Sequence, residues 1–411
     1  MINEAGECVE KIETPGGGTQ KDGGDSRRMT GDKADCVKRD PAAVTYDMVA
    51  AAYKRCRGYV KRTPLVRAER LEKLFGGAEI YFKTENLQYT GSFKMRGVSN
   101  KMMSLSRVEL SRGVAASSSG NHAQAVAYMA SLLGAKAVIV MPEDAPSAKI
   151  DGTRAYGADL IFCGLTAGER EQKCAELIEE RGYSLVHTYA DVDIIAGHGA
   201  LALEAIEQAR GGECGIYVNG DCGTARESIL FDEIAQPCGT AREGVFFDEI
   251  VLPCGTAREG ILFDEIVLPC GAGAIVSGCA VATKGASPET VFTAVEPAIV
   301  ARFTASLKAG RPVAVEPANT IADGLRAYHA DPLNFTLIRD NVDRMLTAGE
   351  ASIRRAAREI ALRAGLVAEP SACVGIAAAL EGSIDMRAGR RVCFVLTGGN
   401  MDTRMLADIM S

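Results

Sequence analysis

The chain has 411 residues, of which 47% are apolar and 24% charged, and its net charge is −7. This length suits two domains or one large α/β unit with a sizeable buried core, and the negative charge disfavours a nucleic-acid partner. The acidic N-terminus lacks an apolar signal segment and no apolar run is long enough to span a bilayer, so we expect a cytoplasmic protein that binds neither nucleic acid nor membrane.

Residues 1–42 are rich in Gly, Asp and Lys and poor in large apolar side chains, which predicts a disordered N-terminal extension. Helix-like and strand-like segments alternate after it. The helix pattern at 121–134 has a predicted buried face formed by Val126, Met129, Ala130 and Leu133. The strand-like segments are 79–85, 113–119, 136–142, 159–164, 265–269, 291–297 and 391–400. This alternation predicts an α/β fold with parallel sheets covered by helices on both faces.

A 16-residue unit that begins with CGTARE occurs three times, at Cys222, Cys238 and Cys254. The second and third copies agree at 14 of 16 positions. We interpret residues 222–269 as a tandem duplication tolerated as an insertion, because lengthening a surface loop costs little closure entropy; a small β-solenoid is the alternative. Only the third copy leads into a helix pattern, so its final EIVLP, residues 265–269, is expected in the main sheet.

After that copy the chain reads PCGAGAIVSG, which places small residues at 271–274 between a strand and a helix. Small side chains let backbone N–H groups approach a ligand at the positive end of a helix, which predicts a phosphate-binding loop. A dinucleotide is an alternative ligand, because Gly271 and Gly273 match the start of G-x-G-x-x-G and Glu296 ends the next strand. Val276, however, replaces the third glycine of that motif.

Lys94 stands in the segment ENLQYTGSFKMRG (85–97), between apolar neighbours at an expected helix start. Burial lowers the pKa of a lysine and makes its amine a Schiff-base nucleophile, whereas an exposed lysine is only a solvated charge. In SSSGNH (117–122), successive hydroxyls and N–H groups at a helix N-terminus suit a carboxylate. An ordinary N-cap is the alternative there.

Together these segments resemble the fold-type II pyridoxal-phosphate enzymes, in the serine/threonine dehydratase and serine racemase family. The resemblance runs from residue 62 to the C-terminus, interrupted by the repeat, with the motifs in family order: YTGSFKMRG, SSGNHAQA, AGHGALALE, TIADGL, EPSACVG and LTGGN. It implies two open, twisted, mainly parallel sheets flanked by helices, with pyridoxal 5'-phosphate between two domains. The large domain would comprise residues 43–115 and 190–411 and the small domain 116–189, and the family's habit implies a homodimer.

The resemblance also implies roles for single residues. Lys94 would hold the cofactor as a Schiff base and move the Cα proton, and Thr397 would keep the pyridine nitrogen unprotonated, which favours β-elimination. The residues implied to bind the cofactor are Phe93, Lys94, Asn121, Gly271, Ala272, Gly273, Ala274, Glu369 and Thr397. Those implied to bind the substrate are Ser118, Ser119, Gly120, Asn121, His122 and Tyr189.

The implied function is a pyridoxal-phosphate-dependent L-serine/L-threonine dehydratase (ammonia-lyase) that gives a 2-oxo acid and ammonia by Schiff-base β-elimination. Ser119 keeps two alternatives open, serine racemase and hydroxyaspartate dehydratase, because these resemble the sequence in having Ser where threonine dehydratases usually have Ala. A catalytic hydroxyl on the face opposite Lys94 can carry the proton that racemisation requires.

Two departures from the family pattern stand out. The phosphate loop is GAGA instead of four glycines, and Ala272 and Ala274 disfavour positive φ, so a non-catalytic paralogue with an impaired cofactor site is an alternative of another class. At the cation site of the racemase-like branch only Glu296 is retained. Val300 and Arg302 hold the positions expected to give a carbonyl and a carboxylate, and because arginine cannot ligate a cation we expect no bound metal.

Overall fold

The computed structural model describes residues 44–118, 120–143, 145, 147–164, 167–211 and 262–411. The chain divides into units 1–41 and 42–411, and all described residues belong to the second. Ser119, the predicted extension 1–42 and the repeat segment up to residue 261 lie outside the described residues.

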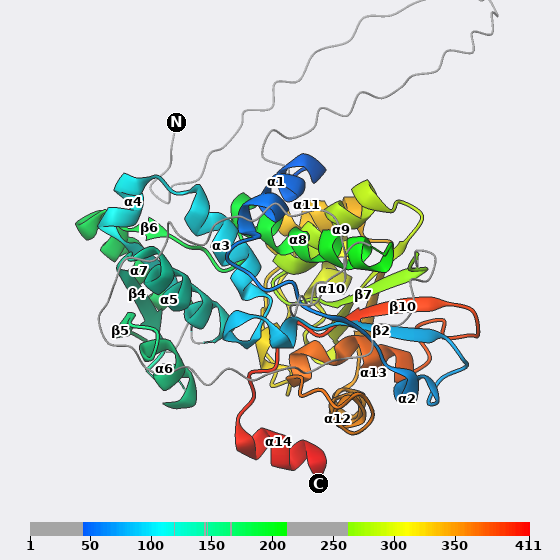
Figure 1. The fold of residues 1–411 in the computed structure, drawn as a ribbon. Coiled ribbons are helices and arrows are strands. Elements are labelled where there is room, and N and C mark those ends of the chain that lie inside the picture. The colour runs from blue at the N-terminus through cyan, green and yellow to red at the C-terminus, as the bar shows by residue number, and fades with distance from the viewer. Residues whose placement is uncertain (1–43, 119, 144, 146, 165–166, 212–261) are drawn as a thin grey trace, which may run out of the picture. The chain divides into compact units, whose positions relative to one another are not determined.

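The larger of two sheets has six strands in the order β1-β2-β10-β7-β8-β9 (Figure 1). Only the pair β1–β2 is antiparallel, and the other pairs are parallel. The strands are β1 (Leu65–Arg67), β2 (Glu79–Lys83), β10 (Arg391–Val395), β7 (Glu265–Pro269), β8 (Val291–Pro297) and β9 (Arg344–Ala348). Because β7 lies between β10 and β8, the strand predicted at the end of the third repeat copy is confirmed in the main sheet.

Side chains of β7 alternate between two cores, one on each face of this sheet. Ile266 and Leu268 join one core and Val267 the other, as the two-residue period of a strand requires. The first core is covered by α1 (Tyr46–Cys56), α8 (Val192–Ala209), α9 (Ala274–Ala286) and α11 (Pro332–Asn341). The second is covered by α2 (Glu69–Glu72), α12 (Glu350–Glu359), α13 (Val374–Leu380) and α14 (Thr403–Met410). The predicted parallel sheet with helices on both faces is therefore confirmed.

The smaller sheet has four parallel strands in the order β5-β4-β3-β6. Its strands are β5 (Asp159–Phe162), β4 (Ala137–Met141), β3 (Val114–Ser117) and β6 (Ser184–Leu185). The helices that follow its strands are α5 (Asn121–Leu133), α6 (Ser147–Arg154) and α7 (Ala167–Arg181). The boundaries 116–189 for a small domain stay a prediction. Within the described segments, no helix combines the length and apolarity needed to cross a lipid bilayer.

Three helices pack with their backbones unusually close, and glycines make this contact possible. They are α3 (Lys94–Ser104), α8 and α9. The other α-helices of the described residues not yet given are α4 (Arg107–Arg112) and α10 (Arg302–Ala309). A Cβ built on Gly197 of α8 would lie 2.6 Å from the Arg96 carbonyl oxygen, and one on Gly278 of α9 would lie 2.1 Å from that of Ile195. Any side chain at either position would push the helices apart. The contact holds α3, the helix that begins with Lys94, against α8, and α8 against α9.

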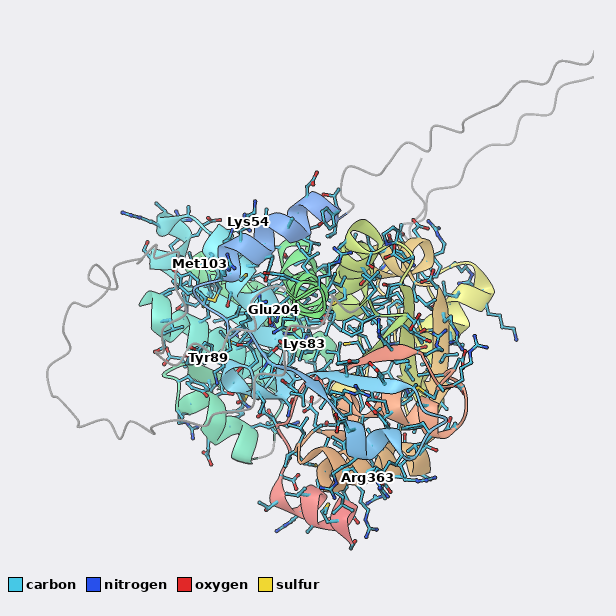
Figure 2. All side chains as sticks on the ribbon, turned by 45° about the vertical axis from the view of Figure 1, so that its right-hand side comes forward. Lys54, Lys83, Tyr89, Met103, Glu204 and Arg363 are labelled. Atoms are coloured by element: carbon cyan, nitrogen blue, oxygen red, sulfur yellow. The ribbon has the colours of Figure 1, made fainter. Side chains whose placement is uncertain are left out.

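A buried cluster of four charges joins β2, α3 and α8: Lys83, Glu85, Arg96 and Glu204. Arg96 donates to both carboxylates at 2.8 Å, and the Lys83 Nζ donates to Glu204 at 2.5 Å. Figure 2 shows Lys83 and Glu204 beside each other in the interior. Burial would raise the pKa of Glu204, but Arg96 and Lys83 together lower it below its ordinary value. The charges therefore balance inside the fold, next to the helix that carries Lys94.

Candidate active site

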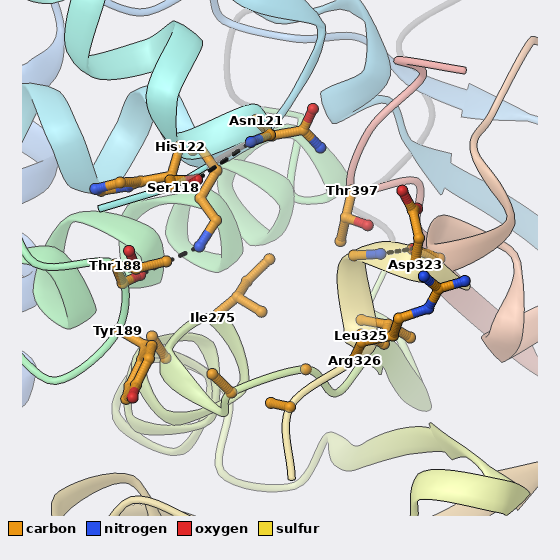
Figure 3. A pocket seen from close by; sticks show the side chains of 18 of the residues that line it. Ser118, Asn121, His122, Thr188, Tyr189, Ile275, Asp323, Leu325, Arg326 and Thr397 are labelled. Carbon is orange, nitrogen blue, oxygen red and sulfur yellow. Dashed lines mark hydrogen bonds between the residues drawn. The ribbon is translucent and has the colours of Figure 1, made fainter. Parts of the chain in front are cut away.

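Lys94 is the first residue of α3 and lies between segments that follow strands of both sheets. The Phe93 N–H donates to the Thr397 carbonyl at 2.9 Å, which holds the helix start beside the end of β10. The Lys94 Nζ donates to the Thr188 carbonyl at 3.2 Å, beyond β6 (Figure 3). The same nitrogen lies 5.1 Å from the centre of the Phe93 ring.

The amine of Lys94 is easier to deprotonate than that of a surface lysine. Burial lowers its pKa to about 8, and the nearby carboxylate of Glu369 opposes part of this shift. At neutral pH an appreciable fraction of the amine is therefore unprotonated, which is the form that attacks carbonyl carbon and accepts protons.

The loop before α5 presents backbone N–H groups and a hydroxyl to the same space. The Gly120 N–H donates to the Ser118 Oγ at 3.3 Å, and Asn121 begins α5. The imidazole of His122 is tied to the Val186 carbonyl through Nε2 at 2.9 Å, and burial lowers its pKa to about 3. The ring of His122 is thus neutral. The group of this residue that can bind a carboxylate is its backbone N–H at the helix start. The predicted catalytic Ser119 lies outside the described residues.

The loop 271–274 joins β7 to the start of α9, as the sequence indicates. Gly273 has φ +98°, and a Cβ there would lie 2.7 Å from the Phe303 ring. Ala272 and Ala274 do not have positive φ, so the conflict expected from the two alanines does not arise. The N–H groups of residues 271–275 make no hydrogen bond to a carbonyl elsewhere in the described part of the chain. This cradle fits a phosphate group.

A chain of hydrogen bonds joins three residues that line the pocket. The Asn121 Nδ2 donates to both oxygens of Glu369, at 3.1 and 3.3 Å, and the Asn400 Nδ2 donates to the Asn121 Oδ1 at 2.8 Å. Burial, and next the charge of Asp323, raise the pKa of Glu369 to about 7. A Cβ on Gly398 would lie 2.6 Å from the Glu369 carboxylate, so the first glycine of LTGGN makes room for this acid.

These groups line one pocket of about 350 Å³, a size that suits a small organic ligand. In Figure 3, Ser118, Asn121 and His122 lie on one wall and Thr397, Asp323 and Arg326 on the opposite one. The structure brings together every described residue predicted for the site: Phe93, Lys94, Ser118, Gly120, Asn121, His122, Tyr189, Gly271, Ala272, Gly273, Ala274, Glu369 and Thr397. Their individual roles stay predictions.

The sequence interpretation missed several polar residues of the pocket. Lys149 of α6 lines the pocket and pairs with Asp323 at 2.8 Å. Arg170 and Arg326 also line the pocket. Asn400 belongs to a quoted motif, but only its contact with Asn121 shows its position. No periodic pattern marks these residues, because they come from separate loops and helices that only the tertiary fold brings together.

Replacing Glu369 by glutamine is expected to flatten the pH dependence of folding in protein prepared without cofactor. The folded pKa of Glu369, about 7, exceeds its ordinary value of 4.5, so the folded state binds the extra proton between these values. The free energy of unfolding therefore falls as the pH rises through this window. The variant should come close to the parent near pH 5 and exceed it by about 3 kcal/mol at pH 8. Urea unfolding at several pH values tests this, with exposed Glu316→Gln as control; parallel profiles for Glu369→Gln and the parent would contradict it.

Comparison with known proteins places this geometry among one class of enzymes. The family model described as "Pyridoxal-phosphate dependent enzyme" matches residues 57–398. The L-threo-3-hydroxyaspartate ammonia-lyase of Saccharomyces cerevisiae is 34% identical over 89% of this chain and 96% of its own. The crystal structure of a T.th. threonine deaminase is 34% identical, with a TM-score of 0.72 over 87% of this chain and 99% of its own. That of Dictyostelium discoideum serine racemase is 32% identical, with a TM-score of 0.70 over the same shares.

Proposed function

The chain belongs to the pyridoxal-phosphate dependent enzymes, and from this membership we propose that it is a β-eliminating ammonia-lyase for small L-3-hydroxy amino acids. L-Serine and L-threonine are the first candidate substrates, and the products are a 2-oxo acid and ammonia. The observation that carries the proposal is the amine of Lys94, which has a pKa of about 8 and lies in a pocket with a phosphate cradle.

Pyridoxal 5'-phosphate is the cofactor of this family, and the residues of the pocket fit it. The open N–H groups and tight glycine turn of 271–274 would hold its phosphate, with Asn121 and Thr397 at the edges of its ring. When bound, the cofactor withdraws electron density from the substrate Cα, which allows loss of the Cα proton and of the β-hydroxyl.

The side chains of the pocket would then position the substrate and move its proton. The N–H groups at the start of α5, with the Ser118 hydroxyl, suit the α-carboxylate. The Lys94 Nζ is the base for the Cα proton, because its lowered pKa lets it accept a proton at neutral pH. Thr397 would offer the cofactor only a neutral hydroxyl, which would limit charge accumulation on its ring and favour elimination.

A dicarboxylate is a second candidate substrate, and Arg326 favours it. Its guanidinium donates to the Thr320 carbonyl at 2.7 and 3.2 Å and has no carboxylate partner within the described segments. It lines the pocket together with Arg170. A β-carboxylate would supply the missing anion, as in L-threo-3-hydroxyaspartate, the amino acid in the name of the yeast relative.

One assay panel tests both candidates. Release of 2-oxo acid and ammonia is measured with L-serine, L-threonine and L-threo-3-hydroxyaspartate, and D-serine is followed separately to detect racemisation. If the dicarboxylate is the substrate, Arg326→Met should raise its KM on the order of ten-fold or more and leave that of L-serine unchanged. Exposed Arg339→Met, outside the pocket, is the matched control.

No elimination from any of the three substrates would contradict the proposed function. D-Serine formation without 2-oxo acid would favour the racemase alternative, and a purified protein that stays colourless with added cofactor would favour the non-catalytic one. We further propose, as the resemblance implies, a cytoplasmic homodimer with a small domain at 116–189.

A further inference from the structure

Arg302, at the start of α10, is a fully buried arginine beside the pocket. Its Nη1 donates to the carbonyls of Val300 at 2.9 Å and Leu325 at 3.3 Å, and its Nη2 donates to the carbonyl of Cys270 at 3.2 Å. Its Nη1 also lies 3.6 Å from the Glu296 carboxylate. Three carbonyls and one carboxylate thus converge on one guanidinium.

Such a set of oxygen atoms is what a hard divalent cation prefers as ligands. Here the space is filled by a positive charge that belongs to the chain, and a second cation placed among these oxygens would meet the guanidinium. The residues therefore do not fit a metal ion. A guanidinium with several donors can bind carbonyls from separate segments at fixed angles, as a cation does, but it cannot dissociate.

Two of the carbonyls bound by Arg302 lie in, or directly before, segments that line the pocket. Cys270 directly precedes the loop 271–274, and Leu325 lies in the turn beside it, since a Cβ on Gly271 would lie 3.2 Å from the Leu325 side chain. Glu296 is held in turn by the N–H groups of Phe303 and Thr304, at 3.0 and 2.8 Å. The ring of Phe303 then packs against Gly273. One buried charge thus connects the phosphate cradle to the 323–326 turn beside it.

We propose that Arg302 is a built-in cation that positions the phosphate loop and the 323–326 turn, so that this protein binds its cofactor without a divalent metal. Arg302 is a positioning residue, since it acts through the backbone of these two segments. The inference rests on the proposed function only for the turnover measurement, because cofactor affinity and thermal unfolding report on it without any substrate.

The first test uses the unaltered holoenzyme. EDTA, followed by added Mg²⁺ or Ca²⁺, should leave its melting temperature, its cofactor dissociation constant and its kcat/KM unchanged. A cofactor affinity or melting temperature that falls in EDTA and returns with either ion would overturn the proposal. This test needs no variant, so it stands even if substitutions at position 302 prevent folding.

The second test exchanges the charge. Arg302→Met should weaken cofactor binding on the order of ten-fold, while Arg302→Lys, which keeps the charge, should restore most of it. Arg302→Asp should lose affinity in EDTA and regain it with Ca²⁺ or Mg²⁺, because the oxygen set then has room for an ion. Exposed Arg311→Met is the control. Equal affinities for the Met and Lys variants would overturn the role of the charge, whereas absent turnover with these affinity changes intact would count against the proposed function alone.

Discussion

Replacing Lys94 by alanine is expected to lower ammonia release by a factor on the order of 10⁴ or more, without destabilising the fold. The amine is the group of the pocket with a pKa near 8, so its loss removes both the attachment point of the cofactor and the base for the Cα proton. Stability should not fall, since burial of this charge opposes folding. Steady-state kinetics and thermal unfolding of the same preparations measure the two effects.

Borohydride reduction of the holoenzyme, followed by peptide mass analysis, locates the amine that carries the cofactor. The label is expected on Lys94 and should disappear in Lys94→Ala. Lys101→Ala, on the same helix, is the matched control and should keep both label and turnover. Lys149 is another lysine of the pocket, so a label there, or turnover of Lys94→Ala near that of the parent, would refute the assignment.

Replacing Glu204 by glutamine is expected to cost about 3–5 kcal/mol of unfolding free energy. The substitution leaves Lys83 and Arg96 buried with only the carboxylate of Glu85 to balance them. A buried charge without its partner is far more costly than the loss of a surface pair. Urea unfolding of the two proteins at one pH measures the difference.

Glu207 provides the control, because it lies one turn later on the same helix and is partly exposed. It accepts a hydrogen bond from Tyr53 and pairs with Arg62 at 3.4 Å. Glu207→Gln should cost about 1 kcal/mol or less. If Glu204→Gln costs no more than this control, the buried cluster does not hold α3 and α8 together.

Strong local patterns in the sequence were enough to predict most of the buried strands and helices. The predicted strand 291–297 matches β8, and 136–142 is one residue longer at each end than β4. Val126, Met129 and Ala130 are buried as predicted, while Leu133 at the end of α5 is only partly buried. β9 was not predicted, because this edge strand is mostly half-buried and lacks a continuous apolar run.

The candidate site was predictable where a short motif follows a strand, and not where residues from distant segments meet. The roles of the loop 271–274 and of Lys94 can be predicted from the residues directly before and after them in the sequence. For Arg302, by contrast, the sequence shows only that an arginine stands where the family pattern has a carboxylate. That its guanidinium reaches carbonyls of Cys270 and Leu325, on either side of it along the chain, depends on packing that no local pattern encodes.

The sequence EIVLP occurs at 249–253 as well as at 265–269, so the chain holds two identical candidates for the central strand β7. A slip of sixteen residues would put Ala257 in the place of Gly273, at φ +98° and against Phe303, and Arg258 in the place of the buried Ala274. Neither exchange is tolerated there. The residues after the strand, rather than the strand itself, therefore decide which duplicate enters the sheet. The loop that forms the phosphate cradle thus also selects the correct register of the chain.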